Sequence, residues 1–425
     1  MILSSFSVKN LFDLYSYEFS LGEKQNLFMI TGPNGYGKTT ILSIINSLSI
    51  ENIYFFYLLT FDEIQIGLRN NTTIKIISNL IEEDNDSDRD ERVVSEKQID
   101  FLWIQEGKLV NKFTLNKRNI KKSVRSIGFY KGTQPNVNNI RSESFIDFIK
   151  SNPQVFEYIA KEQGQEQFLL LLNSLSSTFI TAQRIHPIIK NINGNIANKT
   201  TIGEVVRKLQ EKMQLDYIQY LRKSQSIDTK FIDVLLSTSL IYEEAEYNEK
   251  AILLEKQIEN LSEFGLVSNI KIKAYDKNDA KILTAYLNDF SEKIEVYAKT
   301  AEKLRLFSSL LRKKSFSHKQ VSFSPEYGLR IITEREEFLD VNRLSSGEQN
   351  EIIMLYNFIF EVSDKTVLLI DEPENSLHVA WQKEFIEDIE EITALKNIQT
   401  IIATHSPQII GERWKDCFDL YEQCK

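Results

Sequence analysis

Residues 32–39, with the sequence Gly-Pro-Asn-Gly-Tyr-Gly-Lys-Thr, have the spacing of a phosphate-binding loop. The apolar run 27–30 before the loop is typical of a buried parallel strand, and residues 40–45 after it have helical apolar spacing. Glycines let backbone N–H groups converge on phosphate oxygens, and the N-terminus of the following helix adds a favourable partial charge. The residues expected to bind nucleotide are Asn34, Gly35, Tyr36, Gly37, Lys38, Thr39 and Thr40.

Within this set, Lys38 is expected to reach the β- and γ-phosphates, and the Thr39 hydroxyl is placed to bind Mg²⁺. The other interpretation is a chance match in a flexible loop. The strand-like run before the loop and the helix-like run after it favour nucleotide binding.

A second strand-like run, residues 367–370, ends in the adjacent carboxylates Asp371 and Glu372. Successive strand side chains point to opposite faces of a sheet, so these two groups cannot do the same job. The other interpretation is a solvated strand end without chemistry. The phosphate loop upstream favours a role in nucleotide chemistry.

Ser345 and Glu348 stand three residues apart in front of an amphipathic run at 352–359, which predicts a capping box at a helix N-terminus. Such an N-terminus also attracts anions, so Ser346 and Gly347 are candidates for a second phosphate contact. Both interpretations share one geometry.

Residues 398–403 predict another core strand, which delivers His405 to its carboxyl end. A lone histidine is usually structural, and this chain has only four. Because His405 stands at the tip of the strand that follows the carboxylate pair, we expect it to act in the site.

These motifs, in this order, resemble those of soluble ABC-type ATPases, the AAA-family group that includes SMC proteins, double-strand-break-repair ATPases and OLD-family nucleases. The strings at 32–40, 344–349 and 371–378 read most like those of the stand-alone ATPase subunits of antiphage systems such as Septu and PARIS. The motifs cover only the two ends of the chain. The resemblance implies an α/β ABC-ATPase head, with a P-loop parallel sheet and an antiparallel β-subdomain, that uses ATP and Mg²⁺.

The resemblance also implies roles for the residues. Lys38, Glu372 and His405 would be catalytic, with Glu372 activating the attacking water and His405 contacting the γ-phosphate. Thr39 and Asp371 would hold Mg²⁺, with Asp371 acting through water.

The signature residues would bind the nucleotide of a second head, so that ATP clamps a homodimer or a higher even homo-oligomer. This set is Ser345, Ser346, Gly347 and Glu348. The resemblance further matches residues 374–378 to the loop that touches the partner head.

Length and composition suit a globular head with an insertion, because 425 residues with 42% hydrophobic content can bury a large core. We divide the chain into the N-terminal part of the head at 1–195, a helical insertion at 196–315, and the C-terminal part of the head at 316–425. Two cysteines are too few for a disulfide framework, no export signal is visible and no stretch suits a membrane span, so we expect a cytoplasmic protein.

The insertion shows apolar residues at a 4-3 spacing from 283 to 311, with Ser308 at one seam position. One continuous helix of that length would run roughly 43 Å at about 1.5 Å per residue. The run 247–261 repeats the spacing, and together the two predict an antiparallel helical hairpin. The alternative is a compact helical subdomain with ordinary core faces.

Other segments carry weaker signals. Residues 6–21 predict an antiparallel strand beside the nucleotide strand, and 321–323 with 328–332 predict a strand pair that leads to the signature. Residues 82–92 are polar throughout and predict a solvated loop.

Residues 178–184 predict a strand that ends in Gln183 and Arg184. Related ATPases often carry an Ala-Gln-Arg sequence of this kind near the head. The pair is therefore either a nucleotide sensor or a plain surface pair.

The net charge of −9 argues against a basic surface over the whole domain. Residues 107–142 nevertheless contain no Asp or Glu. They form either a solvated face or a contact for DNA phosphates or an acidic partner. The basic residues there are Lys108, Lys112, Lys117, Arg118, Lys121, Lys122, Arg125, Lys131 and Arg141.

Few residues follow the His405 strand, so we expect no C-terminal Toprim nuclease domain, and the histidines form no metal-ligand cluster in the sequence. The leading interpretation is an oligomeric ATPase scaffold of an antiphage defence complex, which senses infection and controls a separate nuclease or toxin. Two alternatives stay open. One is a DNA-repair or chromosome-maintenance ATPase that acts on DNA, and the other is an ATP-bound interaction scaffold with little turnover.

Overall fold

The computed structural model describes residues 2–22, 26–48, 53–82, 95–116, 118–120, 159–181, 201–237, 239–314, 319–364, 366–375, 377 and 379–423. Several predicted features lie outside these ranges: most of the loop 82–92, the pair Gln183 and Arg184, His378, and the basic residues Lys117, Lys121, Lys122, Arg125, Lys131 and Arg141. The chain folds into two compact units. We call Met1–Ala197 with Val362–Lys425 the sheet unit, and Asn198–Glu361 the helical unit.

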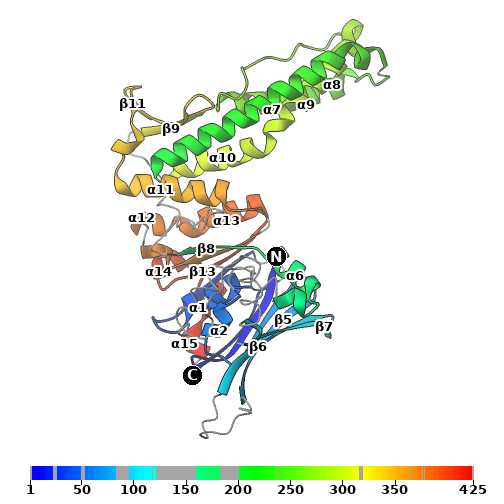
Figure 1. The fold of residues 1–425 in the computed structure, drawn as a ribbon. Helices are drawn as coiled ribbons and strands as arrows, with labels where there is room; N and C mark the ends of the chain where they lie inside the picture. The colour runs from blue at the N-terminus through cyan, green and yellow to red at the C-terminus, as the bar shows by residue number, and fades with distance from the viewer. Residues whose placement is uncertain are drawn as a thin grey trace, which may run out of the picture. The chain divides into compact units, whose positions relative to one another are not determined.

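A five-stranded parallel sheet forms the centre of the sheet unit, in the order β14-β3-β13-β12-β8 (Figure 1). Every residue of β12 and of β13 is buried, as expected where both faces of a parallel sheet are covered. The predicted core strands are confirmed. The strands are β3 (Leu27–Thr31), β8 (Ser177–Thr181), β12 (Val367–Asp371), β13 (Gln399–Ala403) and β14 (Cys417–Asp419).

A six-stranded antiparallel sheet packs in the same unit, in the order β2-β1-β4-β5-β6-β7. Its strands are β1 (Leu3–Leu11), β2 (Tyr15–Ser20), β4 (Glu63–Leu68), β5 (Thr72–Glu82), β6 (Ser95–Gln105) and β7 (Lys108–Asn116).

The predicted strand at 6–21 is therefore wrong in two respects. It is two strands, β1 and β2, and neither is hydrogen-bonded to β3, because β13 and β14 already occupy both edges of β3. Instead β2 lies over β3 face to face, with the Phe19 ring stacked on Phe28 at 5.0 Å. Tyr17, Phe19 and Leu21 are all buried.

Helices cover the two faces of the parallel sheet. Helix α1 contributes Ile41 and Leu42 to the core shared with the antiparallel sheet, whereas α13 lies on the opposite face, where the hydroxyls of Thr393 and Thr400 are 2.8 Å apart (Figure 1). The helices and 3-10 turns of this unit are α1 (Lys38–Asn46), α2 (Phe55–Leu58), α6 (Glu166–Ser174), η7 (Pro373–Asn375), α12 (Val379–Gln382), α13 (Phe385–Lys396), α14 (Pro407–Ile410), η8 (Trp414–Asp416) and α15 (Leu420–Gln423). Within the described ranges, no helix has the length and apolar character needed to cross a membrane.

Long helices dominate the helical unit. They are α7 (Ile202–Ser237), α8 (Glu244–Ser262), η3 (Lys277–Asp279), α9 (Ala280–Ile294), η4 (Glu295–Tyr297) and α10 (Ala298–Lys313). The 4-3 positions of 283–311 are buried, but the single helix predicted there is two helices joined by the 3-10 turn η4.

The main partner of α9 is α7, a pairing that the sequence pattern did not reveal. Tyr220 stacks on Tyr297 at 5.3 Å, Lys223 pairs with Glu292, and Lys281 donates to the carbonyl of Leu236 near the far end. As residue numbers rise along α7 they fall along α9, so the two helices run antiparallel. The hairpin exists, but α7 takes the place predicted for 247–261.

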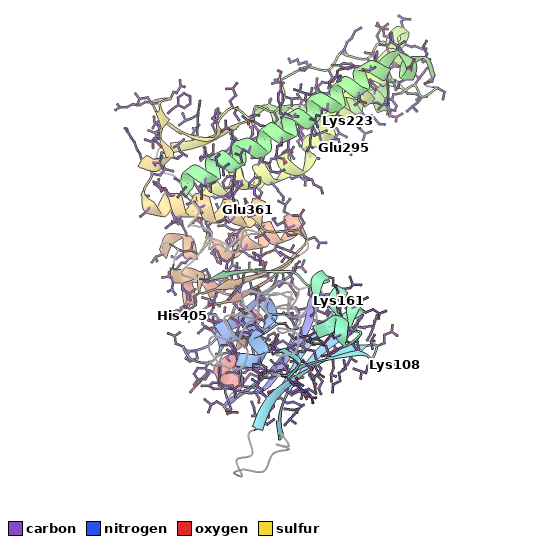
Figure 2. The ribbon with its side chains drawn as sticks, viewed as in Figure 1. Lys108, Lys161, Lys223, Glu295, Glu361 and His405 are labelled. Carbon is purple, nitrogen blue, oxygen red and sulfur yellow. The ribbon has the colours of Figure 1, made fainter. Side chains whose placement is uncertain are left out.

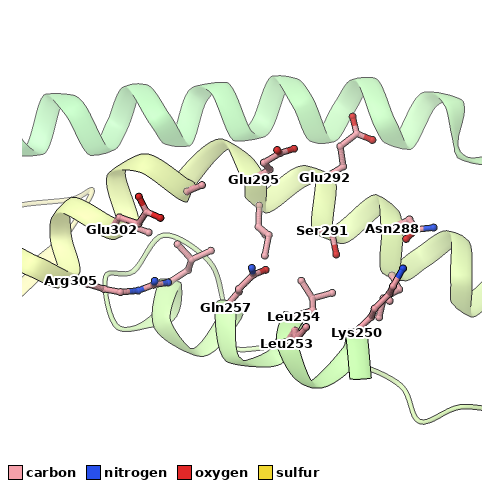
Figure 3. A pocket seen from close by; sticks show the side chains of 15 residues that line it. Lys250, Leu253, Leu254, Gln257, Asn288, Ser291, Glu292, Glu295, Glu302 and Arg305 are labelled. Carbon is pink, nitrogen blue, oxygen red and sulfur yellow. The ribbon is translucent and has the colours of Figure 1, made fainter. Parts of the chain in front are cut away.

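Helix α8, which covers 247–261, is a third helix beside α9 and α10. A cavity of about 600 Å³ lies between them (Figure 3). Lys250 and Arg305 stand at its two ends, and Leu254 is part of its apolar lining. This arrangement agrees with the alternative of a compact helical subdomain better than with a bare two-helix arm.

A small antiparallel sheet, ordered β11-β10-β9, completes the helical unit together with the signature helix. Gly328 needs to be glycine, because its φ is +72° and a Cβ there would lie 2.3 Å from the carbonyl oxygen of Val206 in α7. The elements are β9 (Lys319–Ser324), β10 (Gly328–Thr333), β11 (Phe338–Leu339), η5 (Val341–Arg343), α11 (Ser346–Tyr356) and the π-helix η6 (Asn357–Glu361). Residues 316–361, which the sequence-based division assigned to the C-terminal head, thus belong to the same compact unit as the helices.

The buried pair Lys314–Glu351 offers a test of this packing. The two side chains are 1% and 0% exposed, with Nζ and Oε1 3.8 Å apart. Removing one partner of a buried ion pair typically costs about 3–5 kcal/mol, whereas replacing both with apolar residues is close to neutral. We expect Lys314→Met to destabilise the helical unit and Lys314→Met/Glu351→Leu to restore most of the loss.

Urea unfolding followed by helical circular dichroism measures this effect. The three tryptophans, Trp103, Trp381 and Trp414, all belong to the sheet unit, so their fluorescence serves as the internal control. A double variant as unstable as the sum of both single variants would contradict the prediction.

Candidate active site

The register of the parallel sheet brings three chain segments to one edge. Asp371 pairs with Ala403 across β12 and β13, and Ala403 pairs with Ile30 across β13 and β3. All three strands run in the same direction, so their carboxyl ends lie side by side. Glu372 and His405 follow directly at this edge, which is where ligands bind in open parallel sheets.

The phosphate loop joins β3 to α1 with the backbone shape that its glycines allow. Gly37, directly before the helix, has φ +87°, and a Cβ there would lie 3.3 Å from Leu11 Cδ2. Gly35 has φ +90°, with no other heavy atom within 4 Å of its Cβ position. The loop therefore presents exposed backbone at the N-terminus of α1, which is an anion-binding arrangement.

Tyr36 anchors the loop rather than facing the site. Its carbonyl oxygen accepts a hydrogen bond from Tyr17 Oη at 2.8 Å. Its ring packs against Tyr15 at 5.4 Å and against Tyr421 at 5.9 Å. Any contact of Tyr36 with nucleotide is thus expected through its backbone N–H.

Lys38 is 4% exposed, and its ammonium donates to the carbonyl oxygens of Gly32 at 2.8 Å and Pro33 at 3.2 Å. Both acceptors belong to the phosphate loop itself. Among the described residues, no carboxylate lies within ion-pairing distance of this ammonium. A buried cation held only by carbonyl dipoles is well placed to receive an anion.

Thr39 and Asp371 meet although they are far apart in sequence. The Thr39 hydroxyl donates to both carboxylate oxygens of Asp371, at 3.1 and 2.9 Å. One hydroxyl and one carboxylate in contact are the oxygen ligands that Mg²⁺ takes from phosphate-loop proteins. The predicted metal pair is therefore assembled at one point.

Burial raises the pKa of Asp371 to about 6, although the carboxyl is partly stabilised by its Thr39 hydrogen bond. The charge of Glu372 raises the pKa further, and Lys38 opposes it. Asp371 is 6% exposed, so its charge has little water around it. A cation bound here would relieve this unfavourable charge.

Glu372 turns away from the strand with φ +46°, an unusual conformation for a residue other than glycine. Its backbone N–H donates to the carbonyl of Ala403 at 2.8 Å, which ties this turn to β13. Its side-chain Oε2 accepts a hydrogen bond from Asn375 Nδ2 at 2.9 Å. The carboxylate of Glu372 is thus oriented by Asn375, which the sequence analysis placed only in the loop at 374–378.

His405 stands at the same edge with 44% of its side chain exposed (Figure 2). Its Nδ1 lies 3.8 Å from Glu372 Oε1 and only 3.0 Å from Glu374 Oε1. Glu374 was predicted only as part of a loop touching a partner. One sequence signal could have identified Glu374. It follows the carboxylate pair at the end of β12, and the neighbouring strand β13 leads to His405.

The signature residues belong to the helical unit. Ser345 caps α11, because its Oγ accepts from the Glu348 N–H and Glu348 Oε2 accepts from the Ser345 N–H at 2.9 Å. Lys319 donates to Glu348 Oε1 at 2.7 Å. Burial raises the pKa of Glu348, but the hydrogen bonds from Lys319 and Ser345 outweigh it and lower the pKa overall.

The capping box predicted from the sequence is therefore present. Ser345 and Glu348 form this capping box, and Ser346 and Gly347 are the first two residues of the helix that follows. The N–H groups at such an end have no partner within the helix.

The residues at the sheet edge fit a nucleotide with its divalent cation. The open glycine loop and buried Lys38 suit the phosphates, and the Thr39–Asp371 contact suits Mg²⁺. Glu372, oriented beside them, is a candidate general base.

Comparison with known proteins places this geometry in a family. The sequence pattern of the AAA ATPase domain matches residues 1–410. The chain is also 33% identical to protein ea59 of Escherichia phage lambda over 75 residues, which is 18% of this chain and 14% of ea59. It is 29% identical to the retron Ec83 probable ATPase of Escherichia coli over 147 residues, which is 31% of this chain and 25% of that protein. The chain thus matches only a quarter or less of these relatives' lengths.

Solved structures with similarity include SMC head domains. One, bound to the C-terminal winged-helix domain of ScpA, has 12% identity and a TM-score of 0.34. The head domain from Thermotoga maritima has 10% identity and a TM-score of 0.31. Each comparison covers 96% of this chain and 91% of the other.

The raised pKa of Asp371 gives a stability test. At pH 7.5 the wild-type carboxylate is ionised in a buried place, and Asp371→Asn keeps its shape and a hydrogen-bond acceptor for Thr39 without the charge. We expect the variant without nucleotide to be about 1–3 kcal/mol more stable at pH 7.5. Urea unfolding followed by tryptophan fluorescence measures this.

The pH dependence has a definite sign. The folded pKa is about 6 and the ordinary value is 3.8, so the wild-type penalty develops as pH rises between these values and vanishes below the lower one. The gap between variant and wild type should therefore close as pH falls toward 4. A gap independent of pH would contradict this origin.

Variants of the neighbouring residues Ser345 and Ser346 can distinguish helix capping from the proposed phosphate contact. Ser345 caps α11 and Ser346 does not, so Ser345→Ala should destabilise the helical unit by about 1 kcal/mol. Ser346→Ala is the matched control and should leave stability unchanged. Urea unfolding followed by circular dichroism reports the difference, and equal effects of the two variants would argue against the capping role.

Proposed function

Because the chain belongs to the AAA ATPase domain family, we propose that it binds and hydrolyses ATP, with Mg²⁺, at the carboxyl edge of its parallel sheet. The observation that carries this proposal is the contact of Thr39 with Asp371 directly behind the phosphate loop. Lys38, Glu372 and His405 surround the same edge. Each of these groups has a use in phosphoryl transfer to water.

The proposed roles follow from the surroundings of each group. Backbone N–H groups of residues 34–37 and the Lys38 ammonium bind the triphosphate. Thr39 and Asp371 hold Mg²⁺, which when bound neutralises charge on the phosphate oxygens. Glu372 accepts the proton of the attacking water, and its hydrogen bond from Asn375 keeps the carboxylate in place. His405 contacts the γ-phosphate.

We further propose that the site is completed by a second copy of the chain. Ser346 and Gly347 carry backbone N–H groups at the exposed N-terminus of α11, where the helix dipole favours a phosphate. The capping box holds this end in shape. ATP would then lie between the phosphate loop of one copy and the signature of the other, giving a homodimer or a higher even oligomer.

The biological setting proposed for this ATPase is antiphage defence in the cytoplasm. Support comes from the partial match to a retron ATPase and from the motifs that resemble Septu and PARIS subunits. In this setting ATP-driven closure of two heads would hold or release a separate effector, a nuclease or toxin.

The replacement Glu372→Gln tests the proposed chemistry. It removes the proton acceptor but keeps the shape and an acceptor for Asn375. We expect ATP to bind with unchanged affinity and hydrolysis to fall about 10²- to 10⁴-fold. Phosphate release and equilibrium ATP binding are the two measurements.

Two control variants sharpen the result. Lys38→Ala should lose ATP binding, and Ser346→Arg should keep binding while losing both hydrolysis and the ATP-dependent dimer seen by light scattering. Wild-type turnover in Glu372→Gln would refute the assignment of the base. Full hydrolysis by a monomeric Ser346→Arg protein would refute the shared site.

A further inference from the structure

Glu374 follows the carboxylate pair, and two hydrogen-bond donors and a ring nitrogen of His405 converge on one of its oxygens. Oε1 accepts hydrogen bonds from Thr404 Oγ1 and from the His405 backbone N–H, both at 2.9 Å. The same oxygen lies 3.0 Å from His405 Nδ1. The side chain is 7% exposed, and Oε2 is buried with no hydrogen-bond partner in the part of the chain that the structure describes.

A second set of hydrogen bonds holds Glu374 itself in place. Gln382 Nε2 donates to the carbonyl oxygens of Glu374 at 3.2 Å and Leu377 at 3.3 Å. Gln382 Oε1 in turn accepts from Ser406 Oγ at 3.0 Å, on the loop that carries His405. The turn after β12 and the turn after β13 are thus linked on both sides of Glu374.

We propose that Glu374 is a positioning residue that sets the tautomer of His405. An ionised carboxylate only accepts hydrogen bonds, so the ring nitrogen that faces Oε1 must carry a proton. With the proton on Nδ1, the neutral ring keeps Nε2 as an acceptor for the attacking water, and a ring that has also gained a proton on Nε2 can donate to the γ-phosphate. Glu372, whose Oε1 is 3.8 Å from Nδ1, is too far away to do this. The use of this tautomer in catalysis rests on the proposed ATPase function, whereas the tautomer itself can be measured without ATP hydrolysis.

A carboxylate that only braced the two turns would not select a ring nitrogen. The tautomer is therefore the readout that separates the two roles. Nitrogen NMR of the imidazole ring reports it directly, because protonated and bare ring nitrogens have different chemical shifts. The chain has four histidines, so His405 is assigned by difference from His405→Asn.

The experiment uses the full chain without nucleotide at about pH 8.5, roughly two units above the ordinary histidine pKa. In the wild type we expect protonated Nδ1 and bare Nε2. Glu374→Leu removes the acceptor, and the ring should change to the Nε2–H form that free imidazole side chains prefer. Glu374→Gln should keep the wild-type tautomer, because Thr404 and the His405 N–H both require an oxygen at the Oε1 position.

The same variants are then assayed for ATP hydrolysis. Glu374→Leu should lose about 10- to 100-fold in turnover, by analogy with other carboxylates that orient a histidine, and Glu374→Gln should recover most of it. Glu387→Leu, an exposed carboxylate on α13, is the matched control and should match wild type.

Two results would overturn the proposal: an Nε2–H form in wild type, or the same tautomer in wild type and Glu374→Leu. If Glu374→Leu fails to fold, the wild-type spectrum and Glu374→Gln still decide, since the proposal requires Nδ1–H in both. A wild-type protein that shows the expected tautomer but no ATP hydrolysis would contradict the proposed function and leave the assignment of Glu374 standing.

Discussion

The hydrogen bond between Thr39 and Asp371 is the contact on which the rest of the site depends. It joins the first residues of α1 to the end of β12, and the two residues meet only because β12, β13 and β3 are parallel and in register. A shift of one residue in β12 would turn Asp371 to the other face of the sheet and put Ile370 or Glu372 in its place. The complete burial of β12 and β13 on both faces opposes such a shift, so the hydrophobic core sets the position of the proposed metal ligands.

The charged groups at this edge of the sheet lower the stability of the folded protein. Asp371 is ionised in a buried place that raises its pKa, and Lys38 has only loop carbonyls as acceptors in the described residues. Binding of a phosphate by Lys38 and of a divalent cation by Asp371, as we propose, would stabilise both groups. The surrounding turns are instead held by hydrogen bonds. Asn375 holds Glu372, and Glu374 connects both to the turn of His405, so the groups that we propose to react would need little reorganisation on substrate binding.

Local sequence signals predicted the motifs and the strands that carry them, because apolar runs and their polar ends are read within a few residues. Long-range features were harder to predict. The role proposed for Glu374 depends on the fold, which places residue 374 against residue 405. Helix α7 lies within the helical insertion predicted at 196–315, but its pairing with α9 was not predicted. Its apolar residues give no clear 4-3 pattern, since Leu215, Ile232 and Leu236 are exposed whereas Leu209 is buried. The strand at 6–21 was misplaced because alternation identifies a strand but not the sheet that it joins.

We propose that Thr39 and Asp371 together hold a divalent cation against the phosphates of ATP. Pulsed electron paramagnetic resonance with Mn²⁺ in place of Mg²⁺ tests it most directly, because the bound ion reports the phosphorus nuclei next to it. We expect a bound Mn²⁺ with phosphorus couplings from ATP in the wild type, and loss of this bound species when Asp371 is replaced by Ala. Equal Mn²⁺ binding and equal phosphorus couplings in both proteins would contradict it.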